Sequence, residues 1–265
     1  MIGKRILTAL VAWIFGCLLW AHASPSLTLL AESEFPPYSY KVSDQEIDGI
    51  AIRVVRELMQ RANMAPSIEL QPWIRAYKTA LDKPNIGIFP VKRTYSRNDQ
   101  LYWIGVIAPY PMSVYAIDPT LKNRVTHLWP QTKLRVGAVH QAYVENVLVH
   151  MGFRKGINLF SVTDYPQNVK KLMSNRIDLL PISDYSMAYI LQQSLQQDPS
   201  LPQPYRLMDF HPDRYPVLYL ALSLDSDPAL VKRLQLLLAK MHADGRYDAI
   251  VDDYLKEHHL SKITN

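Results

Sequence analysis

The 265-residue sequence predicts an α/β protein with two lobes, and two observations lead to this fold class. Strand-like apolar runs alternate with segments of helical periodicity, which is typical of parallel sheets joined by crossover helices. The alternation occurs twice, over residues 27–91 and again over residues 134–193. We therefore expect two mixed, mostly parallel sheets with helices on both faces, connected by two hinge strands.

The first set of elements opens with a strand at residues 27–31, followed by a loop that prolines interrupt. Asp48-Gly49 then precedes a helix, because the apolar residues that follow share one helical face: Val54, Val55, Leu58, Met59 and Ala62. The set continues with a strand, a helix and a short buried strand, at residues 68–70, 73–81 and 86–91.

The second set repeats this order. It comprises three strands, at residues 134–139, 157–162 and 177–182, and three helices, at residues 143–151, 166–173 and 187–193. Two further apolar stretches flank the set, at residues 110–117 and 216–224. Both have strand character, and we interpret them as the two chain crossings between the lobes.

The final segment is expected to return to the first lobe through two helices. Asp227 is a good N-cap and Pro228 suits the first helical position, so a helix begins there. Gly245 suits the end of that helix. The apolar residues at 247–255 have the spacing of one face of a last short helix.

The first 23 residues have the features of a secretory signal peptide. Lys4 and Arg5 precede an uncharged apolar run at residues 6–20, and Ala21-His22-Ala23 fits a signal peptidase site. The run is short for a membrane span, although an uncleaved anchor is the alternative. Cys17, the single cysteine, lies inside this run; a lipid attachment there is disfavoured because the run continues beyond it. We expect export to the periplasm, with Ser24 as the first mature residue.

The composition excludes several function classes. Without a cysteine the mature chain has no disulfide framework and no thiolate metal site. The formal net charge of +5, lowered by two when Lys4 and Arg5 are removed, mildly favours anionic ligands. Because Lys and Arg form no dominant cluster, nucleic acid is not an expected partner. No phosphate loop, zinc motif or nucleophile elbow occurs, so we expect no cofactor, no metal and no catalytic activity.

Six short motifs stand in the order and spacing of a known family. They are Phe35-Pro36-Pro37-Tyr38-Ser39-Tyr40, Asp48-Gly49-Ile50-Ala51-Ile52, Arg93-Thr94-Tyr95-Ser96-Arg97, Trp103-Ile104-Gly105, Asn175-Arg176-Ile177-Asp178 and Ala243-Asp244-Gly245-Arg246-Tyr247. Through them nearly all of the mature chain resembles the bacterial extracellular solute-binding proteins of family 3, the amino-acid-type periplasmic receptors of ABC transporters.

This resemblance implies a periplasmic-binding-protein-like clamshell. Lobe 1 would comprise residues 24–110 and 222–265, and lobe 2 residues 111–221 with the two crossings. The implied function is capture of a small polar metabolite, an amino acid or related carboxylate, by hinge closure, with delivery to a membrane permease. The alternatives are ligand sensing for a membrane receptor and a dehydratase-like enzyme on the same fold. A monomer is expected.

In lobe 1 the resemblance assigns Arg97 to the ligand carboxylate, and a guanidinium suits this role because it offers a planar, permanently charged fork. The alternative is a surface arginine paired with Asp99. Thr94 would add its hydroxyl and backbone N–H. Tyr38 and Trp73 are the expected aromatic walls, with ordinary core aromatics as the alternative. Of the neighbours Lys92 and Arg93, at most one is expected to face the cleft.

In lobe 2, Asp184 and Ser183 compete for the position that the resemblance assigns to a ligand ammonium. The start of the helix near Gln141, Ala142 and Tyr143 would hold an anion through backbone N–H groups. This sequence departs from the family there, because His140-Gln141-Ala142-Tyr143 replaces the usual glycine and hydroxyl residue. For the enzyme alternative, Glu145 together with Glu32 or Glu34 could in principle do acid–base work.

Overall fold

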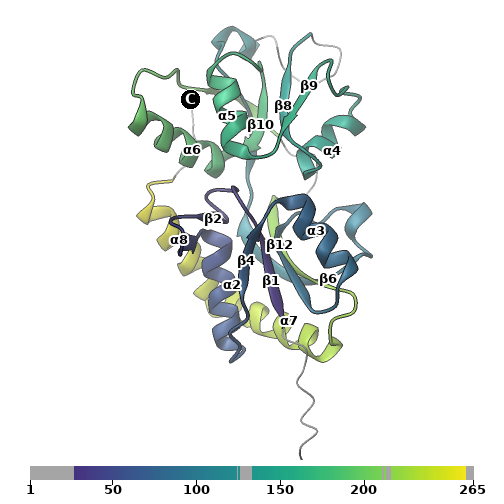
Figure 1. Ribbon diagram of the computed structural model, residues 1–265. Coiled ribbons are helices and arrows are strands. Elements are labelled where there is room, and N and C mark those ends of the chain that lie inside the picture. The colour runs from purple at the N-terminus through teal and green to yellow at the C-terminus, as the bar shows by residue number, and fades with distance from the viewer. Residues whose placement is uncertain (1–26, 124, 126–132, 211, 213–215, 261–265) are drawn as a thin grey trace, which may run out of the picture.

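The computed structural model describes residues 27–123, 125, 133–210, 212 and 216–260. The predicted signal peptide, residues 1–23 with Cys17, lies outside these residues. Figure 1 shows two lobes stacked one above the other, the lower one formed by both the N-terminal and the C-terminal elements. Within the described part of the chain, no helix has the length and apolar character needed to cross a bilayer.

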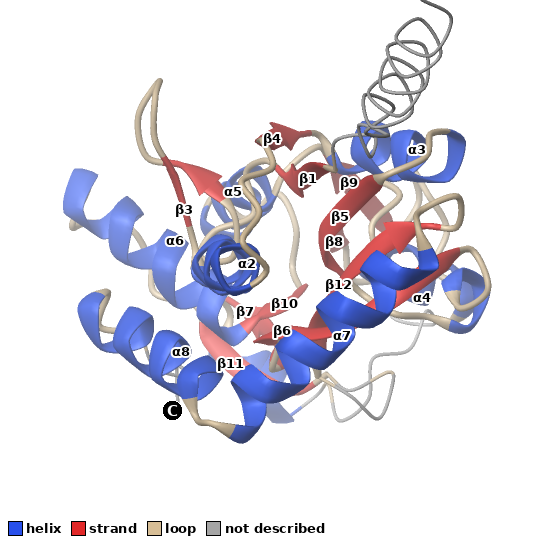
Figure 2. Cartoon of the chain, turned by 90° about the horizontal axis from the view of Figure 1, so that it is seen from below, coloured by secondary structure: helices blue, strands red, loops and turns tan. Residues whose placement is uncertain are grey.

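The first lobe is built on a five-stranded sheet. Its strands run in the order β4 (Ile68–Gln71), β1 (Thr28–Glu32), β5 (Ile86–Val91), β12 (Val217–Ser223) and β6 (Leu101–Pro109). Its helices are α2 (Ile50–Arg61), α3 (Trp73–Asp82), α7 (Pro228–Ala243) and α8 (Arg246–Glu257), with a hairpin of β2 (Tyr40–Lys41) and β3 (Ile47–Asp48). Figure 2 shows α2 and α7 on one side of this sheet and α3 on the other, as predicted.

The second lobe has two smaller sheets. Strands β10 (Leu180–Ser183), β7 (Met112–Ala116) and β11 (Tyr205–Asp209) form one, and β8 (Val136–Val139) and β9 (Leu159–Val162) form the other. The helices are α4 (Tyr143–His150), α5 (Tyr165–Met173) and α6 (Asp184–Gln197). Short 3₁₀ turns are η1 (Tyr95–Arg97), in the first lobe, and η2 (Pro119–Asn123). The two-lobed α/β prediction is confirmed.

Local sequence explains several element ends. The side chain of Asp227 accepts a hydrogen bond from the N–H of Ala229 at 2.8 Å, so the predicted cap of α7 is present. Gly245, in the left-handed region at φ 75°, separates α7 from α8. Gly49 precedes α2 at φ 138°, and a Cβ there would lie 2.2 Å from the carbonyl oxygen of Tyr38. A side chain at that position is therefore excluded.

The sheets are mixed, but parallel pairing does not dominate as expected. Among the described strands, β1 pairs in parallel with β4 and β5, and β8 with β9, whereas β12 and β7 pair antiparallel with both of their neighbours. β7 enters the second lobe and β12 re-enters the first, each coming from the other lobe, whereas the strands beside them run towards the other lobe, so both pair antiparallel with their neighbours. The hairpin of β2 and β3 and the strand β11 had no clear signal in the sequence.

The stretch interpreted as the second crossing, residues 216–224, forms β12 within the first sheet. Val217 pairs with Pro109 and Ser223 with Leu101, so the strand lies beside β6 along its whole length. The lobe boundaries given above stay predictions. This pairing favours a second crossing that ends before residue 217, because β12 already belongs to the first sheet there.

Candidate ligand-binding site

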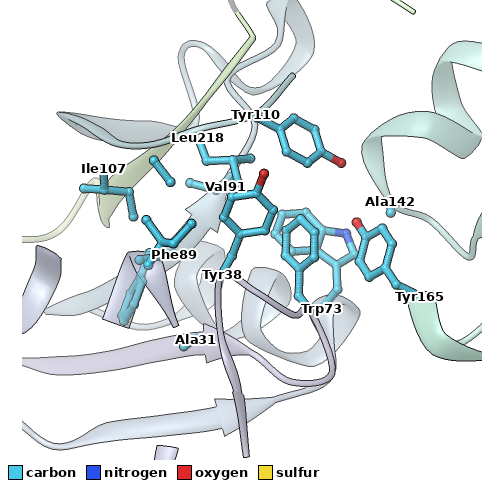
Figure 3. Close-up of a cluster of buried hydrophobic side chains, with 14 of the residues drawn as sticks. Ala31, Tyr38, Trp73, Phe89, Val91, Ile107, Tyr110, Ala142, Tyr165 and Leu218 are labelled. Atoms are coloured by element: carbon cyan, nitrogen blue, oxygen red, sulfur yellow. The ribbon is translucent and has the colours of Figure 1, made fainter. Parts of the chain in front are cut away.

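Aromatic side chains fill the space between the two lobes. Phe35 stacks on Tyr165 of α5 with ring centres 4.3 Å apart, and Tyr38 and Tyr110 pack against Phe35. Figure 3 shows Tyr165, from the second lobe, beside Trp73 of the first. The lobes are thus in direct contact through rings that the sequence supplies from four separate segments.

Two hydrogen bonds also join the lobes. The hydroxyl groups of Tyr38 and Ser183 lie 2.7 Å apart at the start of α6. Nε1 of Trp73, the first residue of α3, donates to the carbonyl oxygen of Gln141 at 3.0 Å. Each bond links a predicted site residue of lobe 1 with one of lobe 2. The structure is therefore a closed arrangement in which opposing site residues bind each other.

An inner cavity of about 20 Å³ remains between the lobes. A space of this size holds about one water molecule. Its lining includes three ionisable side chains of the first lobe, Glu32, Lys92 and Arg97, which are 5–6% exposed. From the second lobe it includes Ala142 and Tyr143, as predicted for the start of α4. Charged groups of one lobe thus face a helix start of the other.

Arg97, at the end of η1, is held among aromatic rings. Its guanidinium carbon lies 4.6 Å from the ring centre of Trp73 and 5.0 Å from that of Tyr77. Nη1 donates to the carbonyl oxygen of Lys92 at 3.2 Å. In the described part of the chain no carboxylate lies within ion-pair distance of it. The alternative of a surface ion pair with Asp99 does not occur, because Arg97 is 6% exposed.

Burial lowers the pKa of the Arg97 guanidinium, and the neighbouring Tyr77 and Glu32 oppose that change. The side chain still remains charged at any physiological pH, since an arginine pKa starts above 12. A buried cation without a close counter-ion is costly. Arg97 is therefore the group in this cleft that gains most from an anionic ligand.

Glu32 ends β1 and faces the same inner cavity. Burial raises the pKa of its carboxyl group to about 8, with Arg97 partly opposing this. From the sequence alone, Glu32 is a candidate only for acid–base chemistry and not for ligand binding. Its position is a signal that was missed, because ligands in α/β folds bind beyond the carboxyl ends of the sheet strands.

Ser183 and Asp184 point in different directions. Ser183 caps α6 through its contact with the N–H of Ser186 at 3.5 Å and faces Tyr38 of the first lobe. Asp184 is fully buried; Oδ1 accepts from the hydroxyl of Tyr115 at 2.8 Å, and Oδ2 has no partner among the described residues. Of the two competing residues, only Ser183 contacts the opposite lobe.

The start of α4 is organised by Glu145, whose side chain is 1% exposed. It accepts hydrogen bonds from the backbone N–H of Gln141 (2.7 Å), Nζ of Lys155 (2.8 Å) and Oγ of Ser161 (2.6 Å). Burial alone would raise the pKa of Glu145, but these donors lower it to about 2. One of the backbone N–H groups that were predicted to hold a ligand anion, that of Gln141, therefore already donates to a carboxylate of the protein itself. The N–H of Ala142 donates to the carbonyl oxygen of Val139.

A larger hollow, which we call the outer groove, adjoins the inner cavity. It has a volume of about 950 Å³ and lies between the loop at residues 92–98 and α4. The predicted site residue Thr94 lies in this groove, with its hydroxyl 3.1 Å from that of Ser96. Lys92 lines both spaces, whereas Arg93 lines the groove only. One of these neighbours thus reaches the inner cavity, in keeping with the alternation of side chains along an extended chain.

The structure thus brings most predicted site residues to one place between the lobes. Arg97, Trp73, Ala142 and Tyr143 line the inner cavity, and Tyr38 forms its interlobe bond close by. Further lining residues are not predicted from the sequence, and they include Glu32, Phe35, Tyr110 and Tyr165. Tyr165 had one usable signal, since it directly follows Asp164, the N-cap of α5.

Solved structures with this fold include a histidine kinase sensor domain with similarity to periplasmic binding proteins. Its TM-score is 0.70 at 14% identity, with 87% of this chain and 96% of that chain covered. An ancestral arginine-binding protein bound to arginine has the same score and identity, with 86% and 97% covered. The amino acid ABC transporter substrate-binding protein AbpA from Streptococcus pneumoniae, bound to L-arginine, has a TM-score of 0.69 at 15% identity, with 89% and 97% covered.

These identities are low, so the likeness establishes the two-lobed fold and leaves the ligand open. A comparison with curated proteins found no match. Residues 27–257 match the family of bacterial extracellular solute-binding proteins, family 3, which spans the described part of the chain almost completely. The motifs around Pro36 and Arg97 and the two-lobed architecture agree with this match, and the chain belongs to the bacterial extracellular solute-binding proteins of family 3.

Proposed function

We propose that this solute-binding protein captures an anionic or zwitterionic metabolite, an amino acid or a related carboxylate, in the periplasm and delivers it to a membrane transporter. The observation that carries the proposal is Arg97, a buried cation at the inner cavity with no carboxylate within ion-pair distance among the described residues. A ligand carboxylate would supply the missing partner in bidentate geometry. Solved structures of the same fold contain arginine, glutamine or lysine, which makes amino acids the first ligands to test.

Hinge closure is the mechanism that fits this placement. The ligand first binds lobe 1 through Arg97 and Thr94, beside the rings of Tyr38 and Trp73. Lobe 2 then closes and adds Ser183 or Asp184 and the start of α4. A ligand stabilises the closed form only through contacts that the open form lacks. The direct bonds Tyr38–Ser183 and Trp73–Gln141 compete with such contacts, so the ligand has to displace part of this packing.

The test is ligand-induced stabilisation of the mature chain, residues 24–265, refolded to remove bound ligand. Amino acids and small carboxylates are screened by thermal shift, and hits are titrated by calorimetry. A ligand at 100 times its Kd stabilises the protein by about 2.7 kcal/mol. Arg97→Ala should weaken binding by roughly 2–4 kcal/mol. Arg56→Ala, an exposed arginine on α2, is the matched control and should bind as the wild type does. Unchanged affinity in Arg97→Ala would contradict the proposal.

Ligand sensing for a membrane receptor is the second candidate, and the likeness to a histidine kinase sensor domain supports it. Uptake of labelled ligand by cells lacking the gene separates the two. Lost uptake supports transport, whereas unchanged uptake with a lost transcriptional response supports sensing. We further propose that the protein is a monomer, binds no nucleic acid and converts no ligand; recovery of unaltered ligand after long incubation tests the last point.

A further inference from the structure

The open volume next to Arg97 is unevenly divided. The inner cavity measures about 20 Å³ and the outer groove about 950 Å³. Pockets that hold small organic ligands usually measure about 300–1,000 Å³. Arg97, Lys92 and Tyr143 line both spaces, so the two are continuous at these side chains. A ligand group that reaches Arg97 therefore has far more room on the groove side than between the aromatic walls.

The groove carries positive charge. Lys92 and Arg97 lie at its inner end, and Arg93 lines it farther out. None of its lining residues that the structure describes is acidic. A concave surface lined by one sign of charge raises the local concentration of the opposite charge. These groups favour a ligand with a carboxylate or another anionic group.

The same groove has an apolar wall. Val147 on α4, Met151 directly after the end of α4, and the ring of Tyr219 are half-buried and line it. Tyr95, at its rim, is 99% exposed. Exposed and half-buried apolar groups beside a cationic end match a ligand that has an anionic head and an apolar body.

We propose that the outer groove is a second compartment of the ligand site, and that it takes the apolar body of an organic anion larger than a free amino acid while Arg97 holds the anionic head. This inference rests on the proposed function, since it assigns Arg97 to the ligand anion. It adds the size and shape of the ligand and the direction in which the ligand leaves the cleft. Arg93 then acts on the body of the ligand or on a second anionic group.

The probes are hippurate (N-benzoylglycine), its neutral amide, and glycine, measured by calorimetry on the mature chain at low salt. Hippurate joins one carboxylate to an apolar ring. It should bind at least about tenfold more tightly than glycine, because the ring is buried in the groove. The neutral amide should bind about tenfold or more weakly than hippurate, because it leaves the charge on Arg97 without a partner.

Three variants on α4 locate the ligand body without altering Arg97. Asn146→Glu adds a negative charge at an exposed position in the groove and should weaken hippurate roughly five- to tenfold. Val149→Glu adds the same charge to the same helix at a 43% exposed position that does not line the groove, and should change affinity less than about twofold. Val147→Trp should weaken hippurate by filling the groove while leaving the affinity for any small amino acid that binds unchanged.

The outcomes separate this inference from the proposed function. Hippurate binding that is lost in Arg97→Ala but unchanged in Asn146→Glu and Val147→Trp would overturn the groove and leave the proposed function intact. A free amino acid that binds more tightly than hippurate, or hippurate that does not bind at all, would also overturn it. Circular dichroism spectra identical to the wild type are required of each variant, and the comparison of Asn146→Glu with Val149→Glu decides the outcome if Val147→Trp does not fold.

Discussion

Two buried glutamates lie on opposite sides of the cleft and differ in charge. Glu145, in the first turn of α4, accepts hydrogen bonds from Gln141, Lys155 and Ser161, and these hold its pKa at about 2. Glu32, at the end of β1, faces the cavity, and burial raises the pKa of its carboxyl group to about 8. At neutral pH the first is ionised and the second is mostly protonated.

The difference shows how the lobes divide their tasks. A carboxylate that is saturated by its own lobe anchors a loop and has little capacity left for a ligand. A carboxyl group with only Arg97 as a distant counter-charge can change its protonation when a ligand arrives. Lobe 1 therefore holds the carboxyl group whose protonation can change in this cleft, whereas the carboxylate of lobe 2 keeps its charge and its hydrogen bonds.

The largest expected effect comes from removing Glu145. Glu145→Ala leaves Lys155, Ser161 and the N–H of Gln141 without their acceptor, and should lower the free energy of unfolding by about 3–5 kcal/mol. Urea denaturation of the mature chain measures it. Glu145→Gln, which keeps the shape and one acceptor oxygen, should lose less. Equal stability of Glu145→Ala and wild type would remove the assignment of Glu145 as the anchor of this loop.

Next in size is the pH dependence caused by Glu32. Its folded-state pKa lies above the unfolded value of 4.5, so its favourable contribution is complete below pH 4.5 and is lost as pH rises towards 8. The side chain in Glu32→Gln is neutral at every pH, so the free energy of unfolding of this variant does not decrease for this reason as the pH rises. Its stability relative to the wild type should therefore rise by about 3 kcal/mol between pH 4.5 and pH 7. Denaturation curves at several pH values test this, and a pH-independent difference would show that Glu32 is ionised in the folded protein.

A smaller effect is expected from the interlobe bond of Trp73. Trp73→Phe keeps a ring beside Arg97 but removes the hydrogen bond to Gln141, at a cost of about 1 kcal/mol to the closed form. Small-angle scattering should report a larger mean radius of gyration for this variant without ligand. Tyr38→Phe, which removes the contact with Ser183, is the parallel case. An unchanged radius in both variants would indicate that ring packing alone keeps the lobes together.

The smallest effect concerns one donor to Glu145. The folded-state pKa of Glu145 is below its unfolded value, so its contribution is present above pH 4.5 and is lost as pH falls towards 2. Lys155→Met removes a half-exposed donor and should cost about 1 kcal/mol or less at pH 7. The loss of stability on acidification should also begin at a higher pH in the variant. Acid titrations followed by circular dichroism compare the two proteins.

Much of the site could be predicted because its signals are local. Arg97 belongs to a short motif beside a strand end, Trp73 to the start of a helix, and Tyr143 to the start of another. A helix start or a strand end can be recognised within a few residues, and such ends line the clefts of α/β folds. The same reasoning applies to Glu32, which ends β1 and was not assigned to the ligand.

The parts that were not predicted depend on contacts between distant residues. Glu145 meets Lys155 and Ser161, and Trp73 meets Gln141 across the two lobes. No periodicity within one segment reports which donor will reach a carboxylate. The position of β12 in the first sheet, and the division of the open volume into a small cavity and a large groove, are likewise properties of the assembled lobes.

The sequence by itself determined the fold class, the two lobes and the place of Arg97 in a turn motif that follows a strand, because hydrophobic periodicity and turn motifs act over a few residues. Only the tertiary structure decided the charge of Glu32 and Glu145, the partners of Tyr38 and Trp73, and the room beside Arg97. Burial and hydrogen-bond partners set these properties, and both arise only when segments far apart in the chain come together.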